Sequence, residues 1–396
     1  MKGCEDELTA FFFGLNQLGN IYRRYTMKKT VITVLMLLVS VCAYAEIKIG
    51  ALLALSGPIS NLGKPGQEII DGVITEANKT NMLGEKITVV SYDTQSMPDR
   101  AQTYAKKLIA KDRVDVIVGP NGTGEALSVI GEAMSSKTPM MAFAGGTSVV
   151  VPVRPFVFKS PQTTTTAIEK AFNYLRKKGI TKIAVAADAT GFGQDGLDQI
   201  NKFSKGFTIT GIEKFNATDN DVTTQMSKLL TAKPQAVVIW TVGRAGAIAA
   251  KSLRVLDPNI LMVQSHGIAD NSYLKLAGAA AENTIMPSVK LTVASSIPAN
   301  DPQKKAIDLF VNKYGKLIDE TSVHASYAYD GINIVLAALK KSKAEKIPLQ
   351  QAMEKITRFV GVTGVYNMSK NDHCGLDLSS MVIVRVKDGK FVLEEM

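Results

Sequence analysis

The stretch Asp-Val-Ile-Val-Gly-Pro-Asn-Gly-Thr-Gly-Glu occupies residues 115–125. Its β-branched run, Val116 to Val118, stops at Gly119-Pro120, and a helical pattern begins near Glu125. The stretch therefore predicts a strand, a tight loop and a helix. At such a junction, free backbone N–H groups and the positive end of a helix dipole point out of the carboxyl edge of a sheet, where a small anion can bind.

Thr123 stands at the start of the predicted helix, and its hydroxyl has two interpretations. It can cap its own helix, or it can donate a hydrogen bond to an anion at the junction. The local sequence does not decide between the two, so the decision rests on the remainder of the chain.

The chain beyond this stretch alternates strand-like and helix-like segments. Strands are predicted at residues 47–55, 87–93, 115–118, 140–144, 182–187, 207–215, 236–240 and 260–264. Helices are predicted at residues 65–79, 98–112, 125–135, 164–178, 197–205, 222–230, 245–256 and 271–277. This alternation favours an α/β fold with parallel sheets. The pattern restarts after Pro161, and a length of 396 residues supports two lobes rather than one very large sheet.

The C-terminal part is mainly helical. Helices are predicted at residues 301–314, 324–340 and 349–357. Two short strands, residues 381–386 and 390–393, close the chain, and Asp388-Gly389 between them indicates a hairpin.

Two glycine-bearing loops, residues 119–124 and 145–148, each follow a predicted strand. Ligands of parallel sheets bind beyond the carboxyl ends of the strands. We therefore expect the two loops to converge on one crevice.

The N-terminal region has the pattern of a secretory signal. Lys28-Lys29 precedes an uncharged run, residues 31–41, and Cys42-Ala43-Tyr44-Ala45 ends in an Ala-x-Ala site, so cleavage is expected before Glu46. The run is short for a bilayer span. Because Met27 directly precedes the lysines, we expect residues 1–26 to be an over-called start and residues 27–45 to be the signal. A lipid anchor on Cys42 is the less favoured alternative, since bulky Val41 precedes it.

The composition argues against a nucleic-acid-binding protein and against a fold held by disulfides. The formal net charge is +10, but the lysines are dispersed in helical patterns, which indicates solvated helix faces rather than a nucleic-acid-binding surface. After removal of residues 1–45 only Cys374 remains, so no disulfide framework is expected.

Catalytic motifs are missing from the sequence. It contains no Gly-x-Ser-x-Gly elbow, His-Glu-x-x-His, Walker loop or Cys-x-x-Cys pair. His266, His324 and His373 are not spaced like metal ligands, and the adjacent pair His373-Cys374 does not by itself indicate a nucleophile. We expect no catalytic residues, no metal and no cofactor. Two lobes with hydroxyl-bearing loops instead favour the capture of a small carboxylate in a hinged cleft.

Several segments resemble type I periplasmic binding proteins, in the branch of Leu/Ile/Val-type ABC transporter receptors. Each segment is weakly specific, but their order and spacing match the family across essentially the whole mature chain. These segments are residues 47–58, Val118-Gly119-Pro120, residues 188–196 with Phe192-Gly193, and residues 274–280.

The resemblance implies two Rossmann-like lobes joined by a three-segment hinge. Residues 46–163 and 289–362 would then form lobe 1. Residues 164–288 would form lobe 2, to which residues 363–396 return.

The resemblance also implies the ligand-binding residues. Thr123, Gly145 and Thr147 would hold the ligand's carboxylate, and Phe192 would cover the ligand. Leu62 would contribute from the first loop. The volume of the pocket would depend on four side chains: Leu62, Phe192, Trp240 and Val242.

One position departs from the amino-acid receptors of this branch, which place an acid where it pairs with the ligand's ammonium group. The matching stretch here is Gln264-Ser265-His266-Gly267, so His266 takes that place. An imidazole pairs poorly with an ammonium but can donate to a phenol or a carboxylate. The Ser-His-Gly stretch, residues 361–368 and residues 372–377 look like a subgroup that binds aromatic acids, so the expected ligand is an aromatic acid or a hydrophobic amino acid.

The expected function is therefore that of a periplasmic receptor, a monomer, which delivers a small carboxylate to an inner-membrane ABC permease and its ATPase. No nucleic acid is expected as a partner. The alternative is a receptor of the same fold that serves signalling or chemotaxis. A transcriptional regulator would need a DNA-binding segment where the signal lies.

Overall fold

The computed structural model describes residues 46–315 and 323–396. The predicted over-called start and signal, residues 1–45, lie outside the described residues. Residues 47–396 form one compact unit that contains two large sheets. None of the helices formed by the described residues has the length and the apolar character needed to span a bilayer.

The first sheet has five parallel strands in the order β2-β1-β3-β4-β5. They are β1 (Ile47–Leu53), β2 (Ile87–Asp93), β3 (Val116–Val118), β4 (Met140–Ala142) and β5 (Val157–Lys159). Strand order reverses at β1, and α/β sheets bind ligands at the carboxyl ends of the strands beside such a point.

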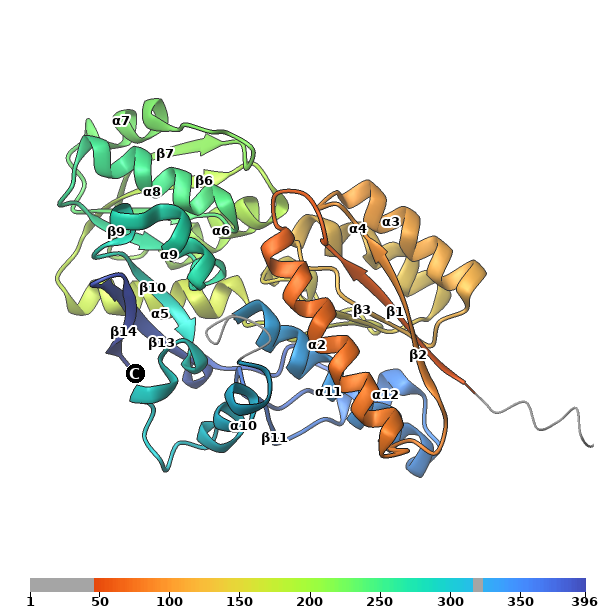
Figure 1. Ribbon diagram of the computed structural model, residues 1–396. Helices are drawn as coiled ribbons and strands as arrows, with labels where there is room; N and C mark the ends of the chain where they lie inside the picture. The colour runs from red at the N-terminus through yellow and green to blue at the C-terminus, as the bar shows by residue number, and fades with distance from the viewer. Residues whose placement is uncertain (1–45, 316–322) are drawn as a thin grey trace, which may run out of the picture. The chain divides into compact units, whose positions relative to one another are not determined.

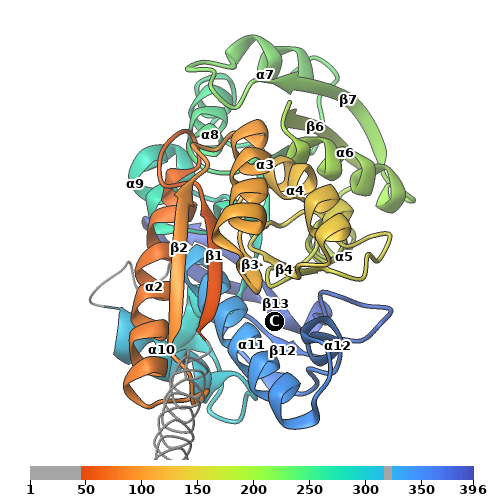
Figure 2. The same cartoon turned by 90° about the vertical axis from the view of Figure 1, so that its right-hand side faces the viewer.

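Helices cover both faces of this sheet (Figures 1 and 2). α2 packs against α11, and α3 packs against α4. The helices are α2 (Ser60–Lys79), α3 (Pro98–Lys107), α4 (Thr123–Ser136), α10 (Lys304–Tyr314), α11 (Val323–Glu345) and α12 (Leu349–Glu354). A small separate ladder joins β11 (Phe359–Val360) to β12 (Val365–Tyr366).

The second sheet has seven strands in the order β14-β13-β10-β9-β8-β6-β7. Its parallel part comprises β6 (Lys182–Asp188), β7 (Thr208–Phe215), β8 (Ala236–Trp240), β9 (Leu261–Gln264) and β10 (Ile285–Val289). Its helices are α5 (Thr164–Lys177), α6 (Gly191–Phe203), α7 (Thr223–Leu230), α8 (Arg244–Leu256) and α9 (Asn271–Ala277).

The end of the chain completes the second sheet. β13 (Met381–Lys387) pairs with β10 in antiparallel fashion, and β14 (Lys390–Glu395) pairs with β13. Asp388 and Gly389 both have positive φ, so the predicted hairpin is confirmed. Figure 1 shows these two strands, blue at the end of the chain, beside β10.

The buried core follows the same division. One apolar cluster contains residues of the first sheet together with α10, α11 and α12, and two others line the faces of the second sheet. The central strands are buried on both faces, as their continuous β-branched sequences require. The predicted two-lobed α/β fold is confirmed, while the segment limits of the lobes stay predictions.

Two predicted helices begin earlier in the structure, and the strands β5 and β10 were not among those predicted. α2 begins at Ser60, before the predicted start at Pro65. α6 begins at Gly191 instead of Leu197, because the Thr190 hydroxyl accepts hydrogen bonds from the first-turn N–H groups. β10 was not predicted, because Pro287 interrupts its apolar run.

Asp330, on α11, ties together the segments that run between the sheets. Its carboxylate accepts the N–H groups of Val362 at 2.9 Å and Thr363 at 2.8 Å. The hydroxyl of Tyr366 donates to the carbonyl of Ser160 at 2.7 Å. Burial raises the pKa of Asp330 to about 6. These hydrogen bonds hold Val362 and Thr363 against α11 and Tyr366 against Ser160.

Candidate functional site

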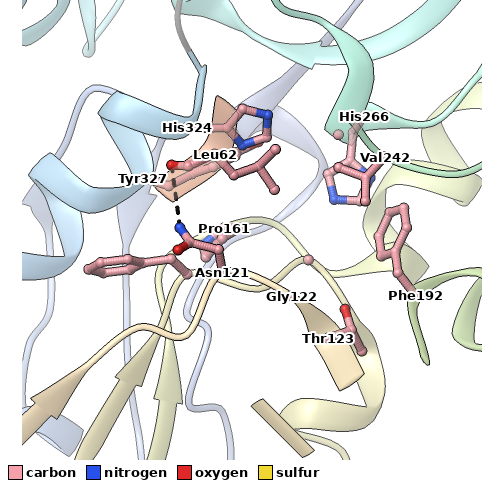
Figure 3. Close-up of a pocket in the computed structure, with 13 residues that line it drawn as sticks. Leu62, Asn121, Gly122, Thr123, Pro161, Phe192, Val242, His266, His324 and Tyr327 are labelled. Atoms are coloured by element: carbon pink, nitrogen blue, oxygen red, sulfur yellow. Dashed lines mark hydrogen bonds between the residues drawn. The ribbon is translucent and has the colours of Figure 1, made fainter. Parts of the chain in front are cut away.

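A cavity of about 360 Å³, its open mouth included, lies where residues of both lobes meet. Side chains from β-strand ends, loops and α11 surround it (Figure 3). Its lining residues are Leu62, Asn121, Gly122, Thr123, Phe143, Gly145, Pro161, Phe192, Val242, His266, Gly267, His324 and Tyr327.

Thr123 begins α4, directly after the loop that follows β3. Gly119 makes this turn with φ of +83°, and a Cβ there would lie 2.0 Å from the carbonyl oxygen of Leu52, so only glycine fits. Oγ of Thr123 accepts the N–H of Gly146 at 3.1 Å, which leaves its own proton free to donate. The first-turn N–H groups of a helix have no partner within the helix. The site therefore offers several donors to an anion.

Gly145, in the second loop, faces lobe 2 at very close range. A Cβ at this position would lie 2.8 Å from Nε2 of His266 and 3.0 Å from Cε2 of Phe192. Its N–H group makes no hydrogen bond to any described residue. The two predicted loops do converge on one crevice, since Gly146 bonds to Thr123.

Phe192, Trp240 and His266 form an aromatic group on lobe 2. Phe192 lies 5.6 Å from His266 and 5.8 Å from Trp240, between ring centroids. Phe192 lies in the first turn of α6, whereas the predicted helix began only at residue 197. Trp240 does not line the cavity: it is fully buried, and its ring centroid lies 5.8 Å from that of Phe192 and 5.8 Å from that of His266. Its bulk supports Phe192 and His266 rather than reaching a ligand.

His266 is held neutral. It is 2% exposed, and burial, with the charge of Lys159 and the proximity of His324 adding to it, lowers its pKa to about 3. Its Nδ1 has no hydrogen-bond partner among the described residues. A buried polar atom without a partner is costly unless a ligand or water pairs with it.

Thr147 does not line the cavity. Its N–H donates to Asp195 at 2.9 Å, and its hydroxyl accepts the N–H of Thr165 at 2.9 Å. Both groups are thus committed to α5 and α6, and the expected direct contact with a carboxylate is not available. Leu62 and Val242, in contrast, do line the cavity. Leu62 reaches it from the first turn of α2, not from a loop as expected.

His324 and Tyr327 line the cavity from α11, and neither was among the residues proposed from the sequence. They stand three residues apart, so both face the same side of the helix. His324 is 5% exposed and Tyr327 is 3% exposed, yet Nε2 of His324 and Oη of Tyr327 have no partner among the described residues. In Figure 3 they lie across the cavity from Thr123. The i, i+3 spacing is visible in the sequence, but the packing of α11 against the site is not.

The cavity lining contains no aspartate or glutamate. Burial lowers the pKa of His324 as well, so both lining histidines are neutral near pH 7. Within residues 46–315 and 323–396, no three His, Cys, Asp or Glu side chains are grouped so that they could hold a metal. The site thus combines anion donors, apolar walls and uncharged polar atoms.

Two doubly wound sheets that enclose such a cavity define a two-lobed solute-binding protein. The periplasmic binding protein family model matches residues 46–390. The chain is 26% identical over 356 residues to "Leu/Ile/Val-binding protein homolog 6" of Brucella suis biovar 1, with 84% of this chain and 87% of the relative covered.

Solved structures show the same architecture. An extracellular ligand-binding receptor from Rhodopseudomonas palustris HaA2 has a TM-score of 0.82 and 27% identity, and the match covers 88% of this chain and 100% of that one. A solute-binding protein of an ABC transporter from Rhodopseudomonas palustris BisB5, in complex with 3,4-dihydroxybenzoic acid, has a TM-score of 0.75 and 22% identity, with 89% and 96% covered.

The chain belongs to the periplasmic binding protein family, in its type I, Leu/Ile/Val-binding branch. Members of this family are extracytoplasmic substrate-binding proteins rather than enzymes, and they bind small ligands.

Proposed function

We propose that this protein is the substrate-binding component of an ABC transporter and that it closes its two lobes on a small organic carboxylate without an α-ammonium group. The observation that carries the proposal is a cavity with anion donors at Thr123 and no acid in its lining. Closure on the ligand would present the surface that the inner-membrane permease and its ATPase recognise.

The donors at the α4 end support binding of the carboxylate. The Thr123 hydroxyl proton, the Gly145 N–H and the first turn of α4 have no other partner in the part of the chain that the structure describes. A charged acceptor makes such hydrogen bonds about twice as strong as neutral ones.

The missing acid supports a ligand without an ammonium group. Burying an unpaired ammonium costs several kcal/mol, and neutral His266 takes the place where, by the family resemblance, amino-acid receptors have an acid. The rings of Phe192 and Phe143 suit an aromatic or apolar body. The bound 3,4-dihydroxybenzoic acid in the protein from Rhodopseudomonas palustris BisB5 agrees with such a ligand.

The polar atoms on α11 suggest what the ligand carries at its other end. Oη of Tyr327 and Nε2 of His324 are buried without partners, so a hydroxyl or carbonyl substituent would satisfy them. An aromatic acid with such a substituent fits better than a wholly apolar acid.

Calorimetry with matched ligand pairs tests the proposal. 3-Phenylpropionate differs from phenylalanine, and 4-methylpentanoate from leucine, only by the α-ammonium group. We expect each acid to bind at least tenfold more tightly than its amino acid, a difference of about 1.4 kcal/mol. Tight binding of leucine, with no binding of either acid, would refute the proposed ligand class.

A transport role and a sensing role differ in the protein that the ligand-loaded receptor contacts. The test reconstitutes in proteoliposomes the permease and the ATPase whose genes lie beside that of this protein. If the protein serves transport, the ligand-loaded protein is expected to stimulate ATP hydrolysis by this transporter. A signalling receptor of the same fold would bind the same ligands and leave the ATPase unchanged.

A further inference from the structure

Lys159, the last residue of β5, is completely buried. Its Nζ donates to three carbonyl oxygens: Gly145 at 2.6 Å, Gly146 at 3.1 Å and Gln162 at 3.1 Å. An ammonium has three N–H donors, so all of them are used. The side chain therefore holds the second ligand loop against the start of a segment that crosses to lobe 2.

Lys159 has no carboxylate within ion-pair distance among the described residues. The negative charge of Asp195 stabilises the protonated form of Lys159 from a longer distance. The oxygens of Asp195 themselves accept the N–H groups of Thr147 at 2.9 Å and Ser148 at 2.8 Å. The thiol of Cys374 is the other neighbour, and burial raises its pKa to about 11, which keeps it neutral. Lys159 is thus a buried cation without a directly bonded counter-ion.

Such a charge is expensive to bury, and burial lowers the pKa of Lys159 to about 8. An apolar side chain of similar volume would fill the same space without this cost. The ammonium nonetheless lies against the carbonyl of Gly145, a residue that lines the cavity. Its charge also contributes to the lowered pKa of His266, on the far side of that loop. The field of Lys159 therefore reaches the cavity.

We propose that Lys159 is the counter-ion of the bound carboxylate, acting through the Gly145-Gly146 loop without touching the ligand, and that it selects anionic over neutral ligands. This inference rests on the proposed function. Lys159 is a positioning residue: it orients the loop and supplies positive potential at the carboxylate end. The Lys159 ammonium and the ligand's carboxylate would be separated only by the backbone of the Gly145-Gly146 loop. In partly buried surroundings, the attraction between two such charges is enough to change ligand affinity by about tenfold or more.

The test compares 3-phenylpropionate with its neutral amide, 3-phenylpropanamide, on wild-type protein and on Lys159→Met. The groups that face Lys159 are Asp195 on α6, Cys374 and His266. In wild type we expect the acid to bind about tenfold more weakly at pH 9.5 than at pH 7, as Lys159 loses its proton, whereas the affinity for the amide stays constant. In Lys159→Met both ligands lose the support that Lys159 gives to the loop, but only the acid also loses its counter-ion. We therefore expect the acid to lose about tenfold more affinity than the amide at pH 7, and the acid-to-amide affinity ratio to be independent of pH.

Proton uptake by wild-type protein tests the idea without a variant. Calorimetry at pH 8.5 in phosphate and in Tris should show fractional proton uptake on binding the acid and none on binding the amide. Equal acid-to-amide affinity ratios in both proteins, or no proton uptake, would overturn the role of Lys159 while leaving the carboxylate site intact. If wild type binds leucine and neither the acid nor the amide, the proposed function fails and the counter-ion role fails with it.

Discussion

The N–H group of Gly146 donates a hydrogen bond to Oγ of Thr123 at 3.1 Å, although the two residues are 23 positions apart in the sequence. This bond joins the loop after β3 to the loop after β4. Because Thr123 accepts this bond, its hydroxyl proton points elsewhere and is free for a ligand. One residue thus both connects the loops of lobe 1 and presents a donor to the cavity.

Replacing Thr123 by valine is expected to weaken binding of 3-phenylpropionate by about 1.5–3 kcal/mol, the contribution of a hydrogen bond to a charged group. Thr123→Ser keeps the hydroxyl and should bind nearly as wild type. Calorimetry gives the affinities, and thermal unfolding without ligand checks that the valine variant is folded. Equal affinities of the valine and serine variants would argue against a ligand contact at Thr123.

The tyrosines Tyr327 and Tyr366 are both buried but differ in their hydrogen bonds. Oη of Tyr327 has no partner among the described residues, whereas Oη of Tyr366 donates to Ser160. In unliganded protein, Tyr366→Phe should lower the free energy of unfolding by about 1–3 kcal/mol, while Tyr327→Phe should leave it unchanged or raise it by about 1 kcal/mol. Urea denaturation measures both. A similar loss in the two variants would mean that Tyr327 bonds within the protein.

Gly145→Ala tests how closely the lobes approach. The added methyl would meet His266 and Phe192, so ligand affinity is expected to fall by about 1–3 kcal/mol through overpacking. Gly131→Ala is the matched control: it lies exposed within α4 with nothing near its Cβ, and should stabilise the helix by about 0.5–1 kcal/mol without affecting binding. Full affinity of Gly145→Ala would show that the closed arrangement has more space than this structure.

The buried histidine predicts acid sensitivity. The pKa of His266 is lowered to about 3 in the folded protein, against about 6.5 when unfolded. Below pH 6.5 the unfolded chain takes up a proton that the folded protein does not, so stability falls as the pH falls. Between pH 7 and pH 5, His266 should account for about 2 kcal/mol of lost stability.

The variant His266→Gln removes this contribution, so its loss of stability between pH 7 and pH 5 should be smaller than that of wild type by the same amount. Urea denaturation at the two pH values measures the difference. Identical losses in variant and wild type would show that His266 is already protonated or solvated in the folded state.

The alternating pattern of the sequence was sufficient for the α/β fold, because β-branched strands and amphipathic helices are local signals. The loop positions of Thr123 and Gly145 followed from the same pattern, since parallel strands present their carboxyl ends at one edge. The start of α6 was missed because its glycines, such as Gly191 and Gly193, disfavour helix, and the cap at Thr190 outweighs them.

The sequence by itself therefore determined two α/β lobes and the meeting of the two glycine-bearing loops at one sheet edge, the features that depend on periodicity and on strand ends. Only the tertiary structure decided which polar groups are free. Thr147 is occupied by Asp195 and Thr165, while His324 and Tyr327, from a helix some 200 residues after Thr123, face the cavity without partners. Whether a side chain is available depends on which distant neighbours satisfy its hydrogen bonds, and no local pattern encodes those neighbours.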